Sequence, residues 1–124
     1  MSRILLDTNA LIWVVRESSR LTPAWRDLLV DANNDVFFSP VSIAEISIKS
    51  SSGKLAMPGG YVTALSQSGY TELPLTVPHA QALSTLPWHH RDPFDRLIIS
   101  QALVENLAVM TSDAAFAPYG VTLV

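Results

Sequence analysis

The sequence predicts an α/β domain with a central parallel sheet that is covered by helices on both faces. Short apolar runs alternate along the chain with longer segments of helical periodicity, and this alternation is typical of parallel sheets. The chain has 124 residues, which suits one domain with one hydrophobic core. We therefore expect residues 1–124 to form a single domain, without linkers or internal repeats.

The N-terminal half begins with the apolar run Arg3–Leu6, which predicts a buried strand that ends at Asp7. Thr8 or Asn9 is expected to cap the helix that follows this strand, to about residue 16, because both residue types are favoured helix caps. The other elements of this half follow from the same signals of apolar runs, caps and prolines. They are a helix from Thr22–Pro23 to about Ala32, a strand at Val36–Phe38, a helix from Ser39–Pro40 to near Gly53, and a helix at Tyr61–Ser68.

The C-terminal half begins with a weak third strand, which we expect at Leu73–Leu75 although Pro74 interrupts it. Thr76 and Pro78 indicate the start of a helix that ends before Pro87. A loop is expected at residues 88–91. The remaining predictions are a long helix from Pro93 to about Asn106, a strand at Ala108–Thr111, a short helical turn at Asp113–Ala117, and a last strand at Val121–Leu123.

Composition limits the classes of function. Hydrophobic residues make up 48% of the chain and charged residues only 15%, so we expect some apolar surface to be buried against a partner or a second copy. The net charge of −3 excludes a general electrostatic attraction to nucleic acid, which would need local basic groups or a metal. The chain has no cysteine, which excludes disulfides and thiolate metal sites. No segment has the pattern of a signal peptide or a membrane span, and we expect a soluble cytoplasmic protein.

Four acidic residues lie at the ends of apolar runs or within apolar helices, where a charged side chain is unexpected. Asp7 and Asp113 follow apolar runs at the carboxyl ends of expected strands, and Glu45 and Asp95 lie in early turns of apolar helices. Ligands of open α/β sheets collect at these strand ends, so we expect some of the carboxylates to meet there. Packed carboxylates need a compensating cation, and oxygen ligands suit Mg²⁺ or Mn²⁺. Hydrolysis of a phosphodiester is the natural reaction of such a site.

Each of these acids also has a structural alternative. Asp7 and Asp113 can cap the helical segments that follow them. Asp92 precedes Pro93, the preferred first residue of a helix, and we favour an N-cap role for Asp92 over a role as alternate ligand. Asp95 is third in the same helix, where interactions with the helix dipole compete with metal binding. The residues alone therefore leave the ligand set open.

Glu45 lies on the third expected helix together with a lysine one turn later. Glu45 stands three residues after Ser42, which is the spacing of a capping box. A helix that begins at Pro40 places Glu45 in the second turn, where it cannot cap. Lys49 can pair with Glu45 or contact a phosphate near the metal, and the sequence favours neither role.

A small basic cluster surrounds the acidic pair of the long helix. Arg91 and Arg96 flank this pair, and His89 and His90 precede it, so the cluster can receive an RNA backbone or form a solvated loop. The histidines also permit a nuclease mechanism without metal, although their spacing gives it no support. Trp88 lies beside the cluster, and tryptophans are more often core or interface residues than base-stacking platforms.

Four segments together resemble the PIN-domain family, and in order and spacing they are most similar to VapC-type toxins of bacterial type II toxin–antitoxin pairs. The segments are Leu5–Asn9, Ser42–Lys49, Asp92–Ile98 and Thr111–Asp113, and the resemblance covers nearly the whole chain. It implies a PIN-like three-layer α/β/α fold, a Mg²⁺- or Mn²⁺-dependent endoribonuclease, and a protein antitoxin that blocks the site. By motif position, the catalytic and metal-binding acids would be Asp7, Glu45, Asp95 (chosen over Asp92) and Asp113, with Thr8, Asn9, Thr111 and Ser112 as polar neighbours.

The same residues bear on assembly and on alternative functions. The apolar composition predicts a homodimer or a complex with an antitoxin segment, with Ile12, Trp13 and the Tyr61–Ser68 helix as expected surfaces. The alternative function is a binding or regulatory domain without nuclease activity, against which the full set of acids argues. A phosphorylation-controlled receiver is excluded because no lysine follows Lys54, and dinucleotide binding is excluded because no glycine-rich fingerprint follows the first strand.

Overall fold

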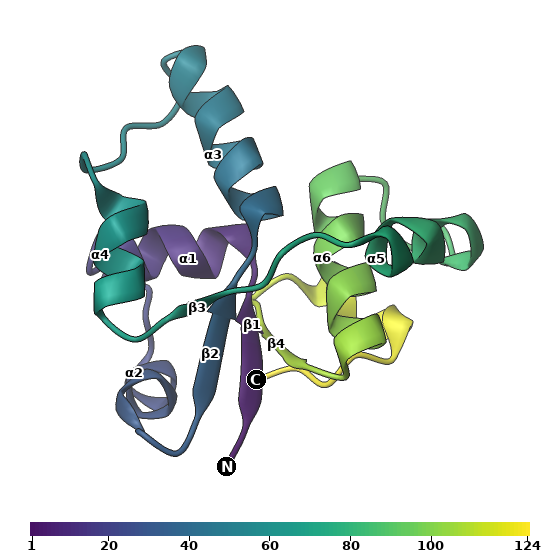
Figure 1. Cartoon of the computed structure of the whole chain (residues 1–124), viewed down its shortest axis with the longest axis horizontal. Helices are drawn as coiled ribbons and strands as arrows, with labels where there is room; N and C mark the ends of the chain where they lie inside the picture. Colours follow the sequence, from purple (N-terminus) through teal and green to yellow (C-terminus); the bar gives the residue numbers. More distant parts are fainter.

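The computed structural model describes residues 1–124, and four parallel strands form the centre of the fold. The strand order is β3-β2-β1-β4, and every pair of neighbours runs parallel. The strands are β1 (Arg3–Leu6), β2 (Asp35–Phe38), β3 (Thr71–Glu72) and β4 (Ala108–Met110). Helices lie on both sides of these strands (Figure 1), which confirms the predicted α/β/α fold with a central parallel sheet.

Strand β1 has an inner position because its side chains are apolar toward both faces of the sheet. Ile4, Leu5 and Leu6 are fully buried, and successive residues of a strand point to opposite faces. Ile4 and Leu6 belong to one core cluster and Leu5 to the other. Burial of each such side chain stabilises the fold by roughly 1.5–3 kcal/mol. This continuous apolar run therefore determines which strand lies in the interior.

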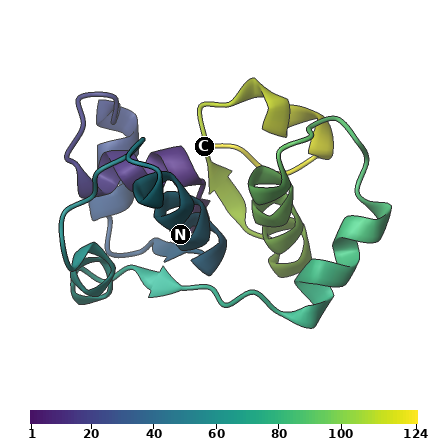
Figure 2. The same cartoon turned by 90° about the horizontal axis from the view of Figure 1, so that it is seen from above.

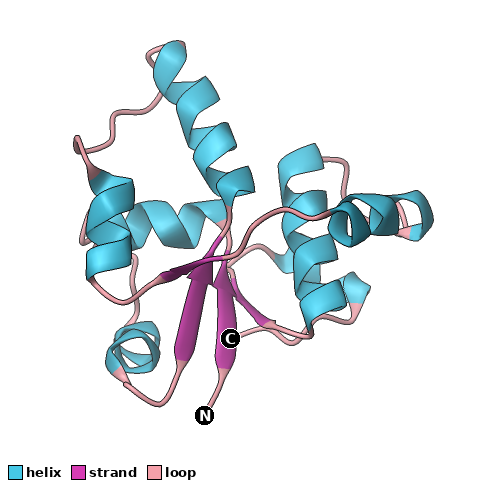
Figure 3. Cartoon of the chain, viewed as in Figure 1, coloured by secondary structure: helices cyan, strands magenta, loops and turns pink.

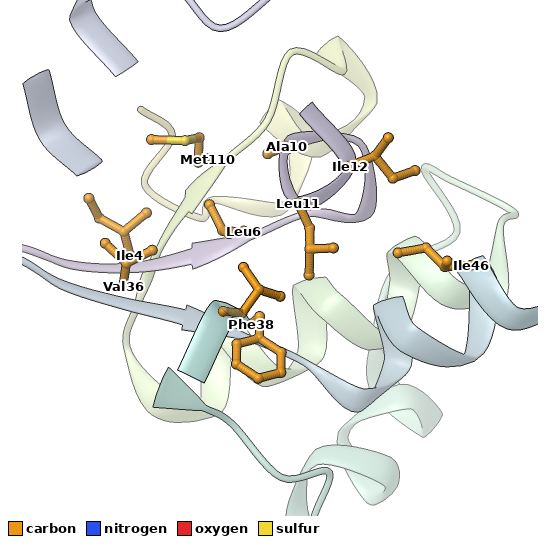
Figure 4. Packing of buried hydrophobic residues seen from close by; sticks show 10 residues of the cluster. Ile4, Leu6, Ala10, Leu11, Ile12, Val36, Phe38, Ile46 and Met110 are labelled. Atoms are coloured by element: carbon orange, nitrogen blue, oxygen red, sulfur yellow. The ribbon is translucent and has the colours of Figure 1, made fainter. Parts of the chain in front are cut away.

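Four helices contribute to the core on the face of the sheet that carries Ile4 and Leu6. They are α1 (Thr8–Val15), α2 (Pro23–Val30), α3 (Pro40–Ser51) and α4 (Tyr61–Gln67). Figure 4 shows apolar side chains of α1 and α3 gathered beside Leu6 and Phe38 of the strands. Ile12 belongs to this cluster and exposes only 8% of its surface. The prediction that Ile12 lies on an association surface is therefore wrong.

The opposite face is covered by the C-terminal part of the chain. It carries α5 (Val77–Ala82), α6 (Pro93–Glu105), and the 3-10 segments η1 (Leu83–Thr85) and η2 (Ala114–Tyr119). Ile98, Ile99 and Ala102 of α6 pack in one cluster with Leu5 and Val109 of the strands. Figure 2 shows the two groups of helices on opposite sides of the strands. The N-terminal end of α3 lies where the two layers meet, because Ser42 is hydrogen-bonded to Thr8 of α1 at 3.0 Å and Ser39 to Gln101 of α6 at 2.6 Å.

Most helix boundaries follow from caps that the sequence displays. The Thr22 hydroxyl accepts a hydrogen bond from the Trp25 amide at 3.1 Å, and Pro23 is the first helical residue, as predicted. Helix α6 ends at Asn106, whose φ of 56° lies in the left-handed region that asparagine tolerates better than most residues. None of the helices combines the length and the apolar character that crossing a lipid bilayer requires.

Two predicted strands differ from the structure (Figure 3). The third strand lies at Thr71–Glu72, two residues before the predicted range, because Pro74 has no amide hydrogen to continue the ladder. The Leu73 amide still donates to the Phe38 carbonyl at 2.8 Å. The predicted last strand is reduced to a single parallel bridge between Val109 and Leu123, so the sheet has four strands.

Candidate metal centre

The four predicted acids lie at the carboxyl edge of the sheet, where β1 and β4 end and α3 and α6 begin. Asp7 directly follows β1, Asp113 comes after β4, Asp95 lies in the first turn of α6, and Glu45 lies in the second turn of α3. The charges of Asp95 and Asp113 both act on Asp7, and the charge of Glu45 acts on Asp95. The structure therefore brings all four acids into one electrostatic neighbourhood.

Asp7 is a buried carboxylate with a role in the fold and an unusual proton affinity. Its Oδ1 accepts a hydrogen bond from the Ala10 amide at 2.7 Å, so Asp7, and not Thr8 or Asn9 as predicted, is the N-cap of α1. Burial, with smaller contributions from the charges of Asp95 and Asp113, raises the pKa of Asp7 to about 6, although the Thr111 side chain and the Ala10 amide favour the charged form. A nearby cation would offset this cost.

His90, Asp95 and Asp113 form the closest group of potential metal ligands. The Nε2 atom of His90 lies 2.8 Å from Oδ2 of Asp95 and 3.6 Å from Oδ2 of Asp113. One potential ligand atom from each of the three residues lies within 4.8 Å of the others. Neighbouring ligands around an octahedral Mg²⁺ ion are about 3 Å apart, given metal–oxygen distances of about 2.1 Å. The group therefore has the dimensions of part of a metal site.

The hydrogen bonds of His90 indicate how its ring is protonated. Its Nδ1 accepts a hydrogen bond from the Arg91 amide at 3.1 Å. In neutral imidazole the other nitrogen then carries the hydrogen, so Nε2 donates to Asp95 at 2.8 Å. Burial raises the pKa of Asp95, the hydrogen bond from His90 lowers it, the charge of Asp92 raises it, a positive charge on His90 lowers it when the ring is protonated, and the charge of Glu45 raises it. His90 therefore orients Asp95 and favours its ionised form.

Asp113 and Asp92 each use one carboxylate oxygen, Oδ1, to cap the helix that follows. Oδ1 of Asp113 accepts from the Ala115 amide at 2.9 Å and caps η2, while Oδ2 faces His90. Oδ1 of Asp92 accepts from the amides of Phe94 at 2.8 Å and Asp95 at 3.2 Å, which confirms the predicted N-cap role of Asp92. Neither carboxylate oxygen of Asp95 caps a helix, so both are available to bind a metal. This availability favours Asp95 over Asp92 as a ligand.

Glu45 has one carboxylate oxygen that no other group of the protein satisfies. Its Oε2 lies 3.1 Å from the Nζ atom of Lys49, so pairing is the role observed for this lysine. Its Oε1 is buried and has no hydrogen-bond partner. A buried carboxylate oxygen without a partner costs more than about 1–3 kcal/mol, because the penalty is larger for charged groups. A metal bound beside Glu45 would remove this cost, so the donor set fits a divalent cation.

Arg96 does not have the role that the sequence suggested. Its side chain is buried, and its guanidinium donates to the carbonyl oxygens of Pro87 at 2.8 Å and Leu86 at 3.1 Å. Arg96 therefore holds the loop before α6 in place and is not available to bind an RNA backbone. Arg91 remains exposed at the same loop. The basic cluster is thus reduced to Arg91 and the histidines.

Sequence reasoning missed the contact between His90 and the acids. His90 precedes Asp95 by five residues across a loop and a helix start, and no periodic spacing connects residues across such a boundary. The loop conformation depends on Arg96 and on Tyr119, whose hydroxyl accepts a hydrogen bond from the His90 amide at 2.7 Å. Both contacts are tertiary, so the only sequence signal was the proximity of His90 to the acidic pair.

Comparison with known protein families agrees with the parallel α/β/α fold described above. The model of the PIN domain family matches residues 4–121. The chain therefore belongs to the PIN domain family, as the four motifs predicted. No curated protein sequence gives a significant match.

Several solved structures share this fold over nearly their whole length. VapBC2 from Rickettsia felis, bound to a DNA fragment of its promoter, matches with a TM-score of 0.73 and 17% identity, covering 98% of this chain and 97% of that chain. DNA-bound VapBC from Salmonella typhimurium matches with a TM-score of 0.73 and 16% identity, covering 100% and 98%. VapBC-5 from Mycobacterium tuberculosis, a member of the VapBC family of toxin–antitoxin systems, matches with a TM-score of 0.57 and 20% identity, covering 100% and 97%. At these identities the similarity establishes the fold.

Proposed function

We propose that the chain is a metal-dependent endoribonuclease in which Asp7, Glu45, Asp95 and Asp113 hold Mg²⁺ or Mn²⁺. The proposal is supported by the placement of four acids at one edge of the sheet, where Asp95 and Asp113 share His90, and by a buried Glu45 oxygen that has no partner. One lysine and one histidine contact these acids directly, which leaves negative charge uncompensated. Hard divalent cations prefer such oxygen donors.

The bound cation would lower the pKa of a water ligand and neutralise charge on a phosphate, which is the chemistry that phosphodiester hydrolysis requires. The residues of the chain prepare this site. Asp7 and Asp113 are fixed by the backbone amides that they cap, at 2.7 Å and 2.9 Å, so their remaining oxygens are held in place. His90 fixes the orientation of Asp95. Preorganised groups of this kind stabilise transition states without reorganisation during the reaction.

We further propose that the chain is the toxin of a toxin–antitoxin pair and that a protein antitoxin covers the site. Support comes from the sequence motifs and from the similarity to the VapBC structures, one of which belongs to a family of toxin–antitoxin systems. An RNA substrate is likewise proposed from the resemblance to VapC-type toxins. In this proposal the protein acts in the cytoplasm, where its RNA substrates occur, and residues 1–124 act as one domain.

Cleavage of RNA by the purified chain tests the proposed activity. Single-stranded and hairpin RNAs are incubated with the protein in Mg²⁺, in Mn²⁺ and in EDTA, and the ends of the products are analysed. We expect cleavage only with metal, leaving 5′-phosphate and 3′-hydroxyl ends, because water and not the ribose 2′-hydroxyl is the nucleophile. Cleavage that survives EDTA and leaves cyclic-phosphate ends would overturn the mechanism. Metal binding without cleavage of any RNA would favour the binding or regulatory domain instead.

A matched control substitution distinguishes the loss of an acid of the site from a general loss of negative charge. Asp27 is exposed on α2, in a different part of the chain from the four acids. Asp27→Asn should cleave RNA like the unmodified chain, whereas Glu45→Gln, which removes the same charge at the site, should lower the rate by roughly two orders of magnitude. Equal rates for the two variants would contradict the assignment of Glu45.

A further inference from the structure

The loop between η1 and α6, which carries His90 of the candidate metal centre, also exposes a tryptophan. Trp88 has 77% of its surface exposed, which makes it the most exposed aromatic residue among the large apolar side chains on the surface. It lies two residues before His90, whose ring contacts Asp95 and Asp113. Two residues span at most about 7 Å of extended chain. Pro93, Arg96 and Leu97 beside Trp88 lie on one face of α6 and Asp95 lies on the opposite face, so about one helix diameter of roughly 10 Å separates a group on Trp88 from the candidate metal centre.

Trp88 is held rigidly although it is exposed. The guanidinium carbon of Arg96 lies 3.8 Å from the centroid of the Trp88 ring, which is the geometry of a cation–π contact. Arg96 is itself buried and donates to the carbonyl oxygens of Pro87 and Leu86 on the same loop. One face of the indole therefore rests on a fixed cation, and the exposed surface belongs to the rest of the ring. This gives a flat aromatic surface that is ordered before any ligand binds.

The cavity next to this ring has a composition that suits a nucleotide. It has a volume of about 240 Å³ and is lined by Leu83, Trp88, Arg91, Pro93, Arg96 and Leu97. The only charged residues in its lining are two arginines, although the chain as a whole carries a net charge of −3. Arginine at a polar rim can meet a phosphate, and an aromatic face can meet a base. Since Arg96 is buried and donates to backbone carbonyl oxygens, Arg91 is the exposed cation of this partly apolar cavity, and the two features together suit an unpaired nucleotide.

The same contacts couple the cavity to the metal centre. Arg96 donates to the His90 carbonyl oxygen at 3.3 Å as well as to the carbonyls beneath Trp88. The positions of the indole ring and of the imidazole ring are thus fixed by one buried side chain. The loop of Trp88 and His90 thus connects the cavity on one face of α6 with Asp95 on the other, since His90 contacts Asp95 at 2.8 Å.

We propose that Trp88 is a stacking platform for an unpaired base of the RNA substrate that flanks the cleavage site across the start of α6, with Arg91 as a contact to the backbone. This inference rests on the proposed ribonuclease function and adds the part of the substrate that the site recognises. It predicts a preference for single-stranded or looped RNA, because a base within a duplex has no free face for stacking.

Binding and cleavage of short labelled RNAs test the platform. Trp88→Ala should weaken the binding of a single-stranded RNA by about tenfold, and Trp88→Phe should recover most of this loss because phenylalanine keeps an aromatic face. Trp88→Ala should raise KM for single-stranded RNA and leave kcat nearly unchanged, since the base is bound equally in ground state and transition state. Binding to a duplex of the same sequence should not respond to Trp88→Ala.

Two further measurements separate stacking from charge. Arg91→Ala should reduce the dependence of affinity on salt by about one phosphate contact, whereas Trp88→Ala should leave this dependence unchanged. The single-stranded RNA should quench tryptophan fluorescence in the unmodified chain and in Trp25→Phe, but not in Trp88→Phe. Trp25 packs against Trp13 at a ring distance of 5.9 Å on the other face of the sheet, so it is a suitable control.

The possible outcomes distinguish this inference from the proposed function. If Trp88→Ala binds and cleaves single-stranded RNA like the unmodified chain, the platform is refuted while the ribonuclease stands. If the unmodified chain cleaves no RNA, the proposed function itself fails. If Trp88→Ala leaves RNA binding intact but changes the oligomeric state in light scattering, the exposed indole is a protein contact and the platform is likewise refuted. Thermal melting of Trp88→Phe, whose ring can still rest on Arg96, confirms that the compared proteins are folded.

Discussion

The Nε2 atom of His90 lies 2.8 Å from Oδ2 of Asp95, and this hydrogen bond lowers the pKa of an acid that burial otherwise raises. We predict that His90→Ala weakens metal binding more at about pH 6 than at about pH 8, because the pKa of Asp95 rises further and a larger fraction is protonated at the lower pH. Cleavage should fall by about tenfold, less than on loss of an acid. The control is His89→Ala, an exposed neighbour, and equal behaviour of the two variants would contradict the role of His90.

The two acids of α6 should differ sharply when each is changed to asparagine. Asp92→Asn keeps an N-cap, because asparagine caps about as well as aspartate, so it should change metal affinity and activity little. Asp95→Asn should lower the rate by roughly two orders of magnitude or more. Calorimetry with Mn²⁺ on both variants and on the Asp7→Asn, Asp95→Asn double variant checks this. Full activity in Asp95→Asn with loss in Asp92→Asn would show that the wrong acid was assigned.

Asp7 should destabilise the metal-free protein at neutral pH. Its pKa is raised to about 6 in the fold from 3.8, so between about pH 4 and pH 6 the folded state binds more protons than the unfolded state. Stability then falls as the pH rises through this window, by as much as about 3 kcal/mol for two pKa units. In EDTA, Asp7→Asn should therefore melt at a higher temperature than the unmodified chain near pH 7, and the difference should vanish near pH 4. Asparagine can keep the cap on Ala10.

Addition of metal provides the control for this stability prediction. Mg²⁺ or Mn²⁺ should raise the melting temperature of the unmodified chain near pH 7 and have much less effect on Asp7→Asn, because a ligand stabilises only the state that binds it. An Asp7→Asn variant that is less stable than the unmodified chain in EDTA at neutral pH would contradict the raised pKa.

The predicted homodimer should depend on the groove between α1 and α4. This groove has a volume of about 280 Å³, and its lining includes Val14, Val15, Tyr61 and Ala64. Light scattering over a range of concentrations should show a dimer, and Ala64→Arg, at an exposed position of α4, should weaken it. A stable monomer at high concentration would rule out the homodimer. A monomer that forms a complex with an antitoxin segment would assign the groove to that partner.

The elements that sequence alone predicted well are those whose signals are local. Leu5 and its neighbours formed a continuous apolar run, and Thr22–Pro23 and Asp92–Pro93 displayed both a cap and a first-turn proline, so β1, α2 and α6 appeared where expected. Short edge elements were less predictable, because pairing with a neighbouring strand decides whether such a segment is extended. Thr71–Glu72 became a strand through its register with Phe37 and Phe38, which its own sequence does not encode.

In the candidate site, too, the features with local sequence signals were predictable and those that depend on tertiary contacts were not. The acids could be found because each interrupts an apolar pattern at a strand end or helix start. The positions of His90 and Arg96 could not be found, because both depend on tertiary contacts of the loop before α6. Arg96 illustrates the difficulty: its charge suggested a surface contact with phosphate, yet four acceptors, the carbonyl oxygens of Leu86, Pro87 and His90 and the hydroxyl of Tyr119, hold it in the interior.

The caps made by Asp7 and Asp113 also have a consequence for mutants that survive selection against a toxic activity. A change at either position to a residue that cannot cap, such as alanine or valine, removes a proposed metal ligand and a helix cap together, so we expect the inactive product to lose folding stability and to be more exposed to proteolysis. Glu45 and Asp95 cap nothing through their side chains, so changes there should give inactive proteins that still accumulate. Escape mutants that remain abundant, and still bind a protective partner, should therefore map mainly to Glu45 and Asp95.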